Sequence, residues 1–204
     1  ETQLRGAGLD GEAKSSLLHT RSRVDLAAEL AKIEALGARL LTPEDDEYPA
    51  LLKHLPDPPF ALYMRGTRLS QDDLALSIVG TRRATTYGRD AAAFFARELA
   101  QQGVTIVSGL AHGIDSAAHR SALEAGGRTI AVMGSGIDRI YPPDHAALAQ
   151  KIVEQGALIS EFPVGSKPEA RHFPRRNRII SGISLGVLVV EAPEKSGALI
   201  TADY

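Results

Sequence analysis

Several short turns of this sequence combine glycine, small hydroxyl residues and arginine, which together can bind an anion. The most basic of them is Gly80-Thr81-Arg82-Arg83, and glycine and serine also pair at Ser108-Gly109 and Gly134-Ser135. Glycine allows a ligand to approach the backbone closely, hydroxyl and amide groups donate hydrogen bonds, and arginine supplies charge. Each turn could instead be a tight connection or helix cap. Their recurrence favours a surface that binds phosphate.

A second candidate is a basic segment near the C-terminal end. Between Lys167 and Arg178 five residues are basic and only Glu169 is acidic. An aromatic ring among arginines can stack on a nucleobase while the guanidinium groups neutralise phosphates. A solvated run of charge is the alternative. We expect a loop at Phe173 and a helix that starts near Arg175, where arginines oppose the helix dipole unless an anion or acid lies nearby. The candidate residues here are Lys167, Arg171, Phe173, Arg175, Arg176, Asn177 and Arg178.

Groups that could support catalysis or bind a metal ion are weaker candidates. His112, Asp115 and His119 could form a cluster, but no glutamate accompanies the histidines as in a hydrolytic zinc site. Asp115 is better explained as the N-cap of a helix. Glu161 and Glu191 follow apolar runs and could act as general acids or bases, although a salt bridge or helix terminus is the better explanation. We therefore predict no catalytic residue and no metal ion.

The sequence contains no motif for a nucleotide cofactor. Neither G-x-G-x-x-G after the first apolar run nor G-x-x-x-x-G-K-[ST] occurs, so we expect no NAD, FAD or ATP and no cofactor at all. A net charge of −2 excludes a globally basic nucleic-acid binder but not a local basic surface. The absence of cysteine excludes disulfides and fits a reducing compartment. Without a signal peptide or an apolar run of about 20 residues, we expect a cytoplasmic protein with no membrane partner.

The candidate turns all follow short apolar runs. Runs without alternation are typical of strands buried on both faces of a parallel sheet, and helix-length segments separate them. Turns that follow parallel strands meet at one edge of the sheet, where ligands bind. The sequence therefore predicts an α/β fold with an extended Rossmann-like, doubly wound, mostly parallel sheet. The expected strands are Leu76–Val79, Thr105–Val107, Thr129–Met133, Ala157–Ile159 and Gly186–Val190, and the expected helices are Arg89–Gln102, Asp115–Ala125 and Asp144–Gln155.

The first part of the chain has a different pattern. Apolar residues recur at helical spacing from Leu26 to Leu36, and Gly37 follows where a C-cap is expected. We therefore assign residues 1–42 to a small N-terminal helical segment, partly disordered or incomplete over 1–22. Prolines among acidic residues mark 43–58 as a linker that packs onto the next domain.

The remaining residues, 59–204, form the expected Rossmann-like domain. Phe60–Met64 reads as an edge strand at its beginning.

These motifs, taken together, resemble the DNA-processing protein A family (DprA, also called Smf). The resemblance covers about residues 59–204 in order, and the combination is highly specific. Residues 1–42 are only loosely similar to the small SAM-like helical module of many members. The motifs that carry the resemblance are Gly80–Ala84, Ser108–Asp115, Gly134–Gly136, Ser160–Pro163, Phe173–Gly182, Glu191-Ala192 and Ser196–Thr201.

The resemblance implies a protein without catalytic activity that binds single-stranded DNA. It also implies a homodimer that loads the recombinase RecA during natural transformation. The Gly80-Thr81-Arg82 turn and the Phe173–Arg178 segment correspond to the strand-binding elements of the family, and Lys167 and Arg171 lie on the approach to them. Family members usually continue beyond the position of Tyr204, so we expect this domain to be truncated at its C-terminal end.

Two other functions compete with this interpretation. Some Rossmann relatives are enzymes that hydrolyse the N-glycosidic bond of nucleoside monophosphates, and they carry a P-G-G-x-G-T-x-x-E motif. That motif is absent around Glu191–Gly197. A pure interaction scaffold would need no ligand at the strand ends.

Overall fold

The computed structural model describes residues 11–194 and 196–204, and seven strands of this part form one sheet in the order β1-β2-β6-β5-β4-β3-β7. The five strands from β3 to β7 are parallel, which confirms the predicted α/β fold. Their bounds lie within one residue of those expected: β3 (Ala75–Val79), β4 (Thr105–Ser108), β5 (Thr129–Met133), β6 (Ala157–Ser160) and β7 (Val187–Val189).

Two antiparallel strands extend the sheet beyond β6. β2 (Leu62–Gly66) pairs with β6, and β1 (Ala38–Leu41) pairs with β2 so that Ala38 lies opposite Arg65. The predicted strand Phe60–Met64 corresponds to β2, and the expectation that it lies at the edge is wrong, because β1 pairs with its outer side. The sequence assigns residues 38–41 to the helical segment, but they form a strand because β2 offers them a hydrogen-bonding partner.

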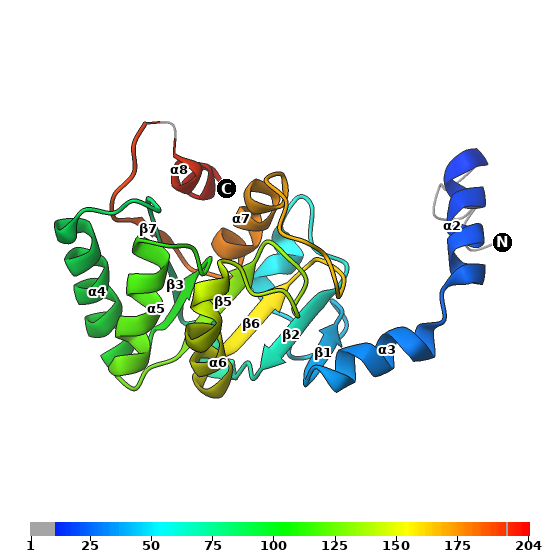
Figure 1. The fold of residues 1–204 in the computed structure, drawn as a ribbon, viewed down its shortest axis with the longest axis horizontal. Helices are drawn as coiled ribbons and strands as arrows, with labels where there is room; N and C mark the ends of the chain where they lie inside the picture. The colour runs from blue at the N-terminus through cyan, green and yellow to red at the C-terminus, as the bar shows by residue number, and fades with distance from the viewer. Residues whose placement is uncertain (1–10, 195) are drawn as a thin grey trace.

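Helices cover both faces of the sheet (Figure 1). One face packs against α4 (Thr86–Gln101), α5 (Ile114–Glu124), α6 (Ala146–Gln155) and α3 (Leu26–Ala35). The other packs against α7 (His172–Gly182) and the 3-10 helix η1 (Ala50–His54). Two further 3-10 helices are η2 (Ser70–Asp73) and η3 (Pro143–His145), and α8 (Gly197–Asp203) follows β7.

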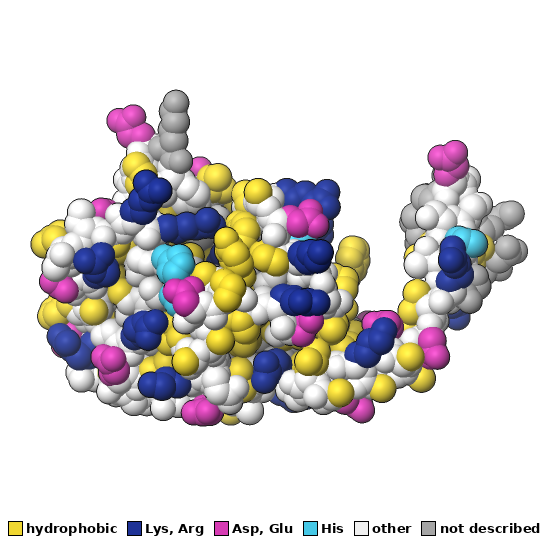
Figure 2. Space-filling model, in the orientation of Figure 1, with side chains coloured by type: hydrophobic (Ala, Val, Ile, Leu, Met, Phe, Trp, Pro, Cys, Tyr) yellow, Lys and Arg dark blue, Asp and Glu magenta, His cyan; other side chains and the backbone are white. Residues whose placement is uncertain are grey.

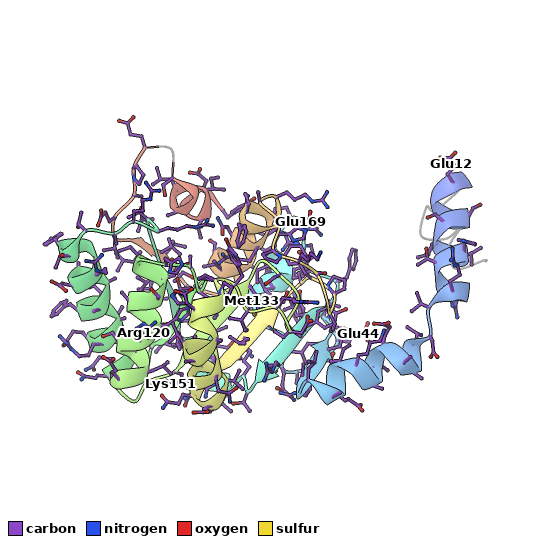
Figure 3. The ribbon with its side chains drawn as sticks, viewed as in Figure 1. Glu12, Glu44, Arg120, Met133, Lys151 and Glu169 are labelled. Carbon is purple, nitrogen blue, oxygen red and sulfur yellow. The ribbon has the colours of Figure 1, made fainter. Side chains whose placement is uncertain are left out.

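Side chains follow the expected division between core and surface. Met133 is buried at the end of β5, whereas Arg120 on α5 and Lys151 on α6 are exposed (Figure 3). Among the described residues, no helix is both long and apolar enough to cross a membrane.

Of the two N-terminal helices, α3 lies beside the β1 end of the sheet and α2 projects away from it (Figure 1). The helix α3 begins after the N-cap Asp25, and Ile33 is its buried residue. Gly37 follows the end of the helix with φ +63, the left-handed conformation that a glycine after a helix adopts. The helix α2 (Gly11–Arg23) precedes it and is exposed along most of its length. The part of the predicted segment before Gly11 lies outside the described residues.

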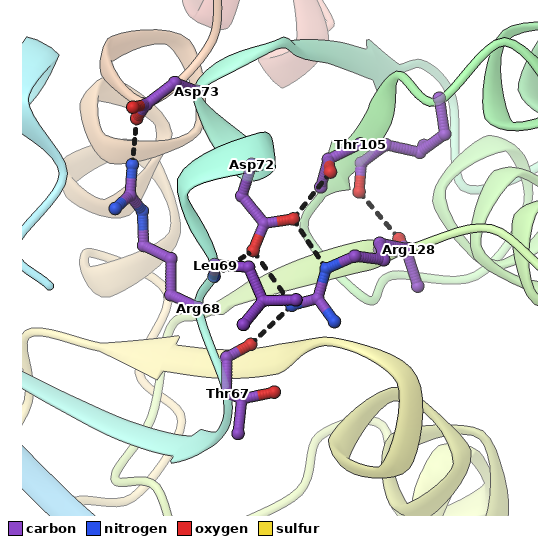
Figure 4. A network of polar contacts seen from close by, with 9 residues as sticks. Thr67, Arg68, Leu69, Asp72, Asp73, Thr105 and Arg128 are labelled. Atoms are coloured by element: carbon purple, nitrogen blue, oxygen red, sulfur yellow. Dashed lines mark hydrogen bonds and ion pairs between the residues drawn. The ribbon is translucent and has the colours of Figure 1, made fainter.

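A buried carboxylate joins three elements at the amino ends of the strands (Figure 4). Asp72 of η2, 2% exposed, accepts hydrogen bonds from Arg128 Nε at 2.7 Å, Thr105 Oγ1 at 2.6 Å and the Leu69 amide at 2.8 Å. Burial alone would raise the pKa of Asp72, but these hydrogen bonds and the Arg128 charge hold it below its ordinary value. Arg128 also donates to the Thr67 carbonyl at 2.6 Å, so the network connects η2 to the starts of β4 and β5.

Candidate nucleic-acid interface

The Gly80-Thr81-Arg82-Arg83 turn lies at the carboxyl end of β3, beside a pocket of about 640 Å³. β3 lies between β4 and β7, so the chain reverses its order in the sheet at this point. Open α/β sheets bind ligands at such a switch point. The starts of α7 and α8 form the opposite wall of the pocket. The edge where the sequence predicts ligand binding is therefore hollow.

Phe173 brings the two predicted segments together. Its ring centroid lies 5.1 Å from the guanidinium carbon of Arg82 and 5.9 Å from that of Arg176. Tyr141 packs against the same ring with centroids 5.7 Å apart, and a Cβ on Gly134 would come within 2.8 Å of it. The expectation of a loop here is wrong, because α7 begins at His172 and Phe173 lies in its first turn.

The Thr81 turn is held by the neighbouring elements. A side chain at Gly80 would meet Ile114 Cγ1 at 2.4 Å, so only glycine fits between β3 and α5. The Thr81 amide donates to the Glu191 carbonyl at 2.7 Å, and its hydroxyl accepts from the Arg83 amide at 3.2 Å. The amide of Thr81 is therefore engaged, and the exposed guanidinium groups of Arg82 and Arg83 are what the turn presents to solvent.

Arg176 forms a buried positive charge in the wall of the pocket. It is 4% exposed, and burial lowers its pKa to about 10, against the attraction of Asp115, so the group is still protonated at neutral pH. A Cβ on Gly109 would come within 1.6 Å of Arg176 Nη1, so this glycine leaves room for the guanidinium.

Asp115 holds the loop beneath Arg176. Its carboxylate accepts the amides of Gly109 at 3.1 Å and Ala111 at 3.3 Å. Burial raises the pKa of Asp115, and the charge of Arg176 opposes that rise. The N-cap of α5 is Gly113, with φ +77, so the expectation of Asp115 as N-cap is wrong.

The other basic residues of α7 differ in their surroundings. The side chain of Arg178 is 7% exposed and pairs with Glu161 at 2.6 Å and with Asp57 at 3.5 Å. That of Arg175 is 59% exposed and lies 3.2 Å from the same Glu161. Asn177 is buried and donates to the Gly197 carbonyl at 3.1 Å, so it connects α7 to the start of α8. Arg178 faces the interior, and Arg175 faces solvent.

The predicted serine hydroxyls point inward. Ser108 Oγ donates to the Ile78 carbonyl and Ser135 Oγ to the Arg139 carbonyl, each at 2.6 Å, and both residues are buried. Ser160 Oγ donates to the Ser135 carbonyl at 2.6 Å. These residues shape the turns around the pocket without lining it.

The remaining basic candidates surround a second hollow of about 520 Å³ beside the first turn of α7. Lys167, Arg171 and Arg175 lie on its rim, and His172 stacks on Phe162 with centroids 4.1 Å apart. Arg171 pairs with Glu169 at 2.8 Å but its side chain is 80% exposed. Figure 3 places Glu169 beside α7, and Figure 2 shows basic side chains gathered over this part of the face.

The acidic candidates for catalysis have structural partners. Glu191 accepts hydrogen bonds from the Thr85 amide at 3.0 Å and hydroxyl at 2.9 Å, at the start of α4. Glu161 is the partner of Arg178. Both residues therefore have the helix-terminus and salt-bridge roles that the sequence favoured.

The predicted histidine cluster is not assembled. His119 is buried, and its Nδ1 lies 2.7 Å from Thr129 Oγ1, which itself donates to the Ile106 carbonyl. Burial lowers the pKa of His119 to about 3. His112 is exposed and lies near Asp144 and His145 instead.

Tyr141 lines the pocket and was not anticipated from the sequence. It lies in an irregular segment whose position depends on packing against other elements, and its sequence context carried no signal. Ser196 also lines the pocket; it belongs to the Ser196–Thr201 motif but was not selected as a binding residue.

Comparison with known proteins identifies the family. The family model of DNA recombination-mediator protein A matches residues 39–204. The chain belongs to this family. Among curated relatives, it is 52% identical to Protein Smf of Synechocystis over 81% of the chain and 43% of that protein. It is 45% identical to Protein Smf of Escherichia coli over 88% of the chain and 48% of that protein. The chain thus spans about half the length of these family members.

Solved structures of family members have the same fold. DprA from Streptococcus pneumoniae superposes with a TM-score of 0.85 at 35% identity, over 95% of this chain and 67% of that one. DprA from Helicobacter pylori superposes with a TM-score of 0.74 at 34% identity, over 81% of this chain and 74% of that one. The Helicobacter structure is described as revealing a single-stranded DNA binding mode.

Proposed function

We propose that this chain binds single-stranded DNA across the carboxyl ends of β3 and β7. The observation that carries the proposal is the position of two guanidinium groups, those of Arg82 and Arg176, over the ring of Phe173 at 5.1 and 5.9 Å from its centroid. A half-buried aromatic ring with flanking cations offers a stacking face for a base and charge for its phosphates. The single-stranded DNA binding described for the Helicobacter relative supports the choice of ligand.

The burial of each side chain divides the predicted residues into two groups. We assign contact with the DNA to residues that are exposed or line one of the two hollows, and these are Gly80, Thr81, Arg82, Arg83, Lys167, Arg171, Phe173, Arg175 and Arg176. The other six candidates shape the site, and these are Ser108, Gly109, Gly134, Ser135, Asn177 and Arg178. Asn177 also lines the pocket, but its amide donates to the Gly197 carbonyl.

A salt titration of binding tests this function. Each phosphate neutralised on a single strand contributes a slope of about 0.7 to the fall of log affinity with log salt. We expect a salt-dependent affinity for single-stranded oligonucleotides, little dependence on sequence, and weaker binding of a duplex, whose paired bases cannot stack on Phe173. Equal affinity for both forms, or binding that salt does not weaken, would contradict the proposal.

The wider role of the family suggests the context of this binding. We propose that the chain acts in the cytoplasm, without catalysis, as part of a homodimer that loads RecA onto single-stranded DNA in natural transformation. Membership of the recombination-mediator family supports this role. Sedimentation of the chain alone tests the dimer. RecA ATPase activity on single-stranded DNA, with the protein and with its Arg82→Ala variant, tests the loading.

The competing N-glycosidase function has a direct test. Glu161 and Glu191, the acids at the strand ends, already accept hydrogen bonds or ion pairs from Arg178 and Thr85. Incubation with nucleoside monophosphates should release no free base, and release that depends on Glu161 or Glu191 would favour the enzyme.

A further inference from the structure

Three potential metal ligands meet beside the pocket, in residues that the DNA-binding site does not use. His112 belongs to the connection between β4 and α5, and Asp144 and His145 belong to η3. One donor atom from each of the three lies within 4.8 Å of the other two. Figure 2 shows a histidine and an acidic side chain adjacent on the face above α5 and α6.

His145 is held as a metal-binding histidine is held. The residue is 3% exposed, and its Nδ1 lies 2.9 Å from the Leu110 carbonyl oxygen. A carbonyl can only accept a hydrogen bond, so Nδ1 carries the proton and Nε2 keeps its lone pair. A backbone carbonyl that fixes the tautomer and ring orientation in this way is the usual outer partner of a histidine that binds a metal through its other nitrogen.

The other two ligands are free to adjust around that fixed ring. His112 Nε2 lies 3.7 Å from Asp144 Oδ1, and their side chains are 52% and 66% exposed. The rings of His112 and His145 meet edge to face, with centroids 4.7 Å apart. Bonds of about 2.0–2.1 Å in a tetrahedral zinc site separate the donors by about 3.3 Å, a distance that small rotations of two exposed side chains can reach.

We propose that His112, Asp144 and His145 bind one divalent transition-metal ion of the class that prefers imidazole, such as Zn²⁺. Two imidazoles and one carboxylate suit Zn²⁺ better than Mg²⁺ or Ca²⁺, which prefer oxygen ligands. The ion connects the Ala111 and Tyr141 segments, both of which line the DNA pocket. The alternative is a surface ion pair of His112 with Asp144 beside an unrelated buried histidine, and such an ion pair has little effect on stability.

Titration calorimetry of the untagged chain with Zn²⁺ tests the proposal, because it needs no DNA and does not depend on the proposed function. We expect one saturable site per chain, and a bound Co²⁺ with the visible absorption of a site of low coordination number. At a free Zn²⁺ concentration of about 100 times the dissociation constant, Tm should rise by about 5–10 °C. Mg²⁺ should give neither heat nor a Tm shift.

Two variants and one control assign the site to these side chains. His112→Ala and Asp144→Asn alter exposed residues and should each weaken Zn²⁺ binding about tenfold or more, since loss of an outer partner alone costs about that much. His54→Ala removes another exposed histidine as a matched control and should leave binding unchanged. The proposal is overturned if Zn²⁺ does not saturate one site, or if it binds His112→Ala as tightly as the unaltered chain.

Discussion

Arg82 and Arg178 have the same chemistry and opposite surroundings, so their removal should affect different properties. Arg82 is exposed beside Phe173, whereas Arg178 is paired in the interior with Glu161, whose side chain is 12% exposed. Truncating one member of a buried ion pair costs about 3–5 kcal/mol. Because Arg175 still lies 3.2 Å from Glu161, we expect Arg178→Ala to cost about 3 kcal/mol, at the lower end of that range.

The size of each effect can be converted into a measurement. For a domain of this size, about 3 kcal/mol corresponds to a fall in Tm of about 6–12 °C in a thermal scan. Arg82→Ala should leave Tm unchanged and reduce the salt slope of single-stranded DNA binding by about 0.7. Between about 50 and about 200 mM salt, one such contact corresponds to a change of about 2.6-fold in affinity.

A fluorescence anisotropy titration at several salt concentrations, below the Tm of both variants, separates the two roles. Arg178→Ala should keep the salt slope of the unaltered chain. In a double-mutant cycle, Glu161→Gln together with Arg178→Ala should recover part of the lost stability, because the nearly buried Glu161 then carries no charge that lacks its closest partner. A reduced slope with an unchanged Tm for Arg178→Ala would refute the division into surface and interior arginines.

Three further predictions concern single side chains. Phe173→Ala should weaken single-stranded DNA binding by about 1–3 kcal/mol without changing the salt slope in the same titration, since the ring carries no charge; a changed slope would mean that the ring positions Arg82. His119 has a folded pKa of about 3 against 6.5 when unfolded, so the unfolded chain gains the proton first. Folding stability should therefore fall by about 1.4 kcal/mol per pH unit as the pH drops from 6.5 towards 3. Chemical denaturation at several pH values measures the free energy of unfolding, and in His119→Gln its slope with pH should correspond to one proton fewer taken up on unfolding. An identical pH dependence in the two proteins would contradict the low pKa. Asp72→Ala should destabilise the chain by about 3–5 kcal/mol, because Arg128 loses its partner, and should leave DNA affinity unchanged at a temperature where the variant is folded; weaker DNA binding there would show that the two ends of the strands are coupled.

The parallel strands could be predicted from sequence because burial on both faces leaves an unbroken apolar run. In β5, all five residues from Thr129 to Met133 are buried, and the predicted bounds are those observed. β1 was missed for the opposite reason. Ala38–Leu41 is too short to show a period, and its conformation depends on pairing with β2, more than twenty residues away.

The position of the candidate site could be predicted better than the roles within it. Turns after parallel strands must meet at one edge, so Thr81 and Phe173 could be placed at the same edge of the sheet. Their contact depends on the packing of α7, because β5 and β4 separate β6 from β3. Which arginine of α7 faces inward depends on Glu161, which comes from the end of β6. The helix was expected to begin near Arg175, but it begins at His172, and its first turn tolerates Pro174.

The network around Asp72 and the pocket beside Thr81 lie at opposite ends of the same strands. Substitutions in the pocket could therefore change the ligand that it binds while the network around Asp72 maintains the stability of the fold. Variants selected for altered ligand preference should accumulate changes around Arg82 and retain Asp72, Arg128 and Thr105, and variants selected for heat tolerance should retain the same three residues.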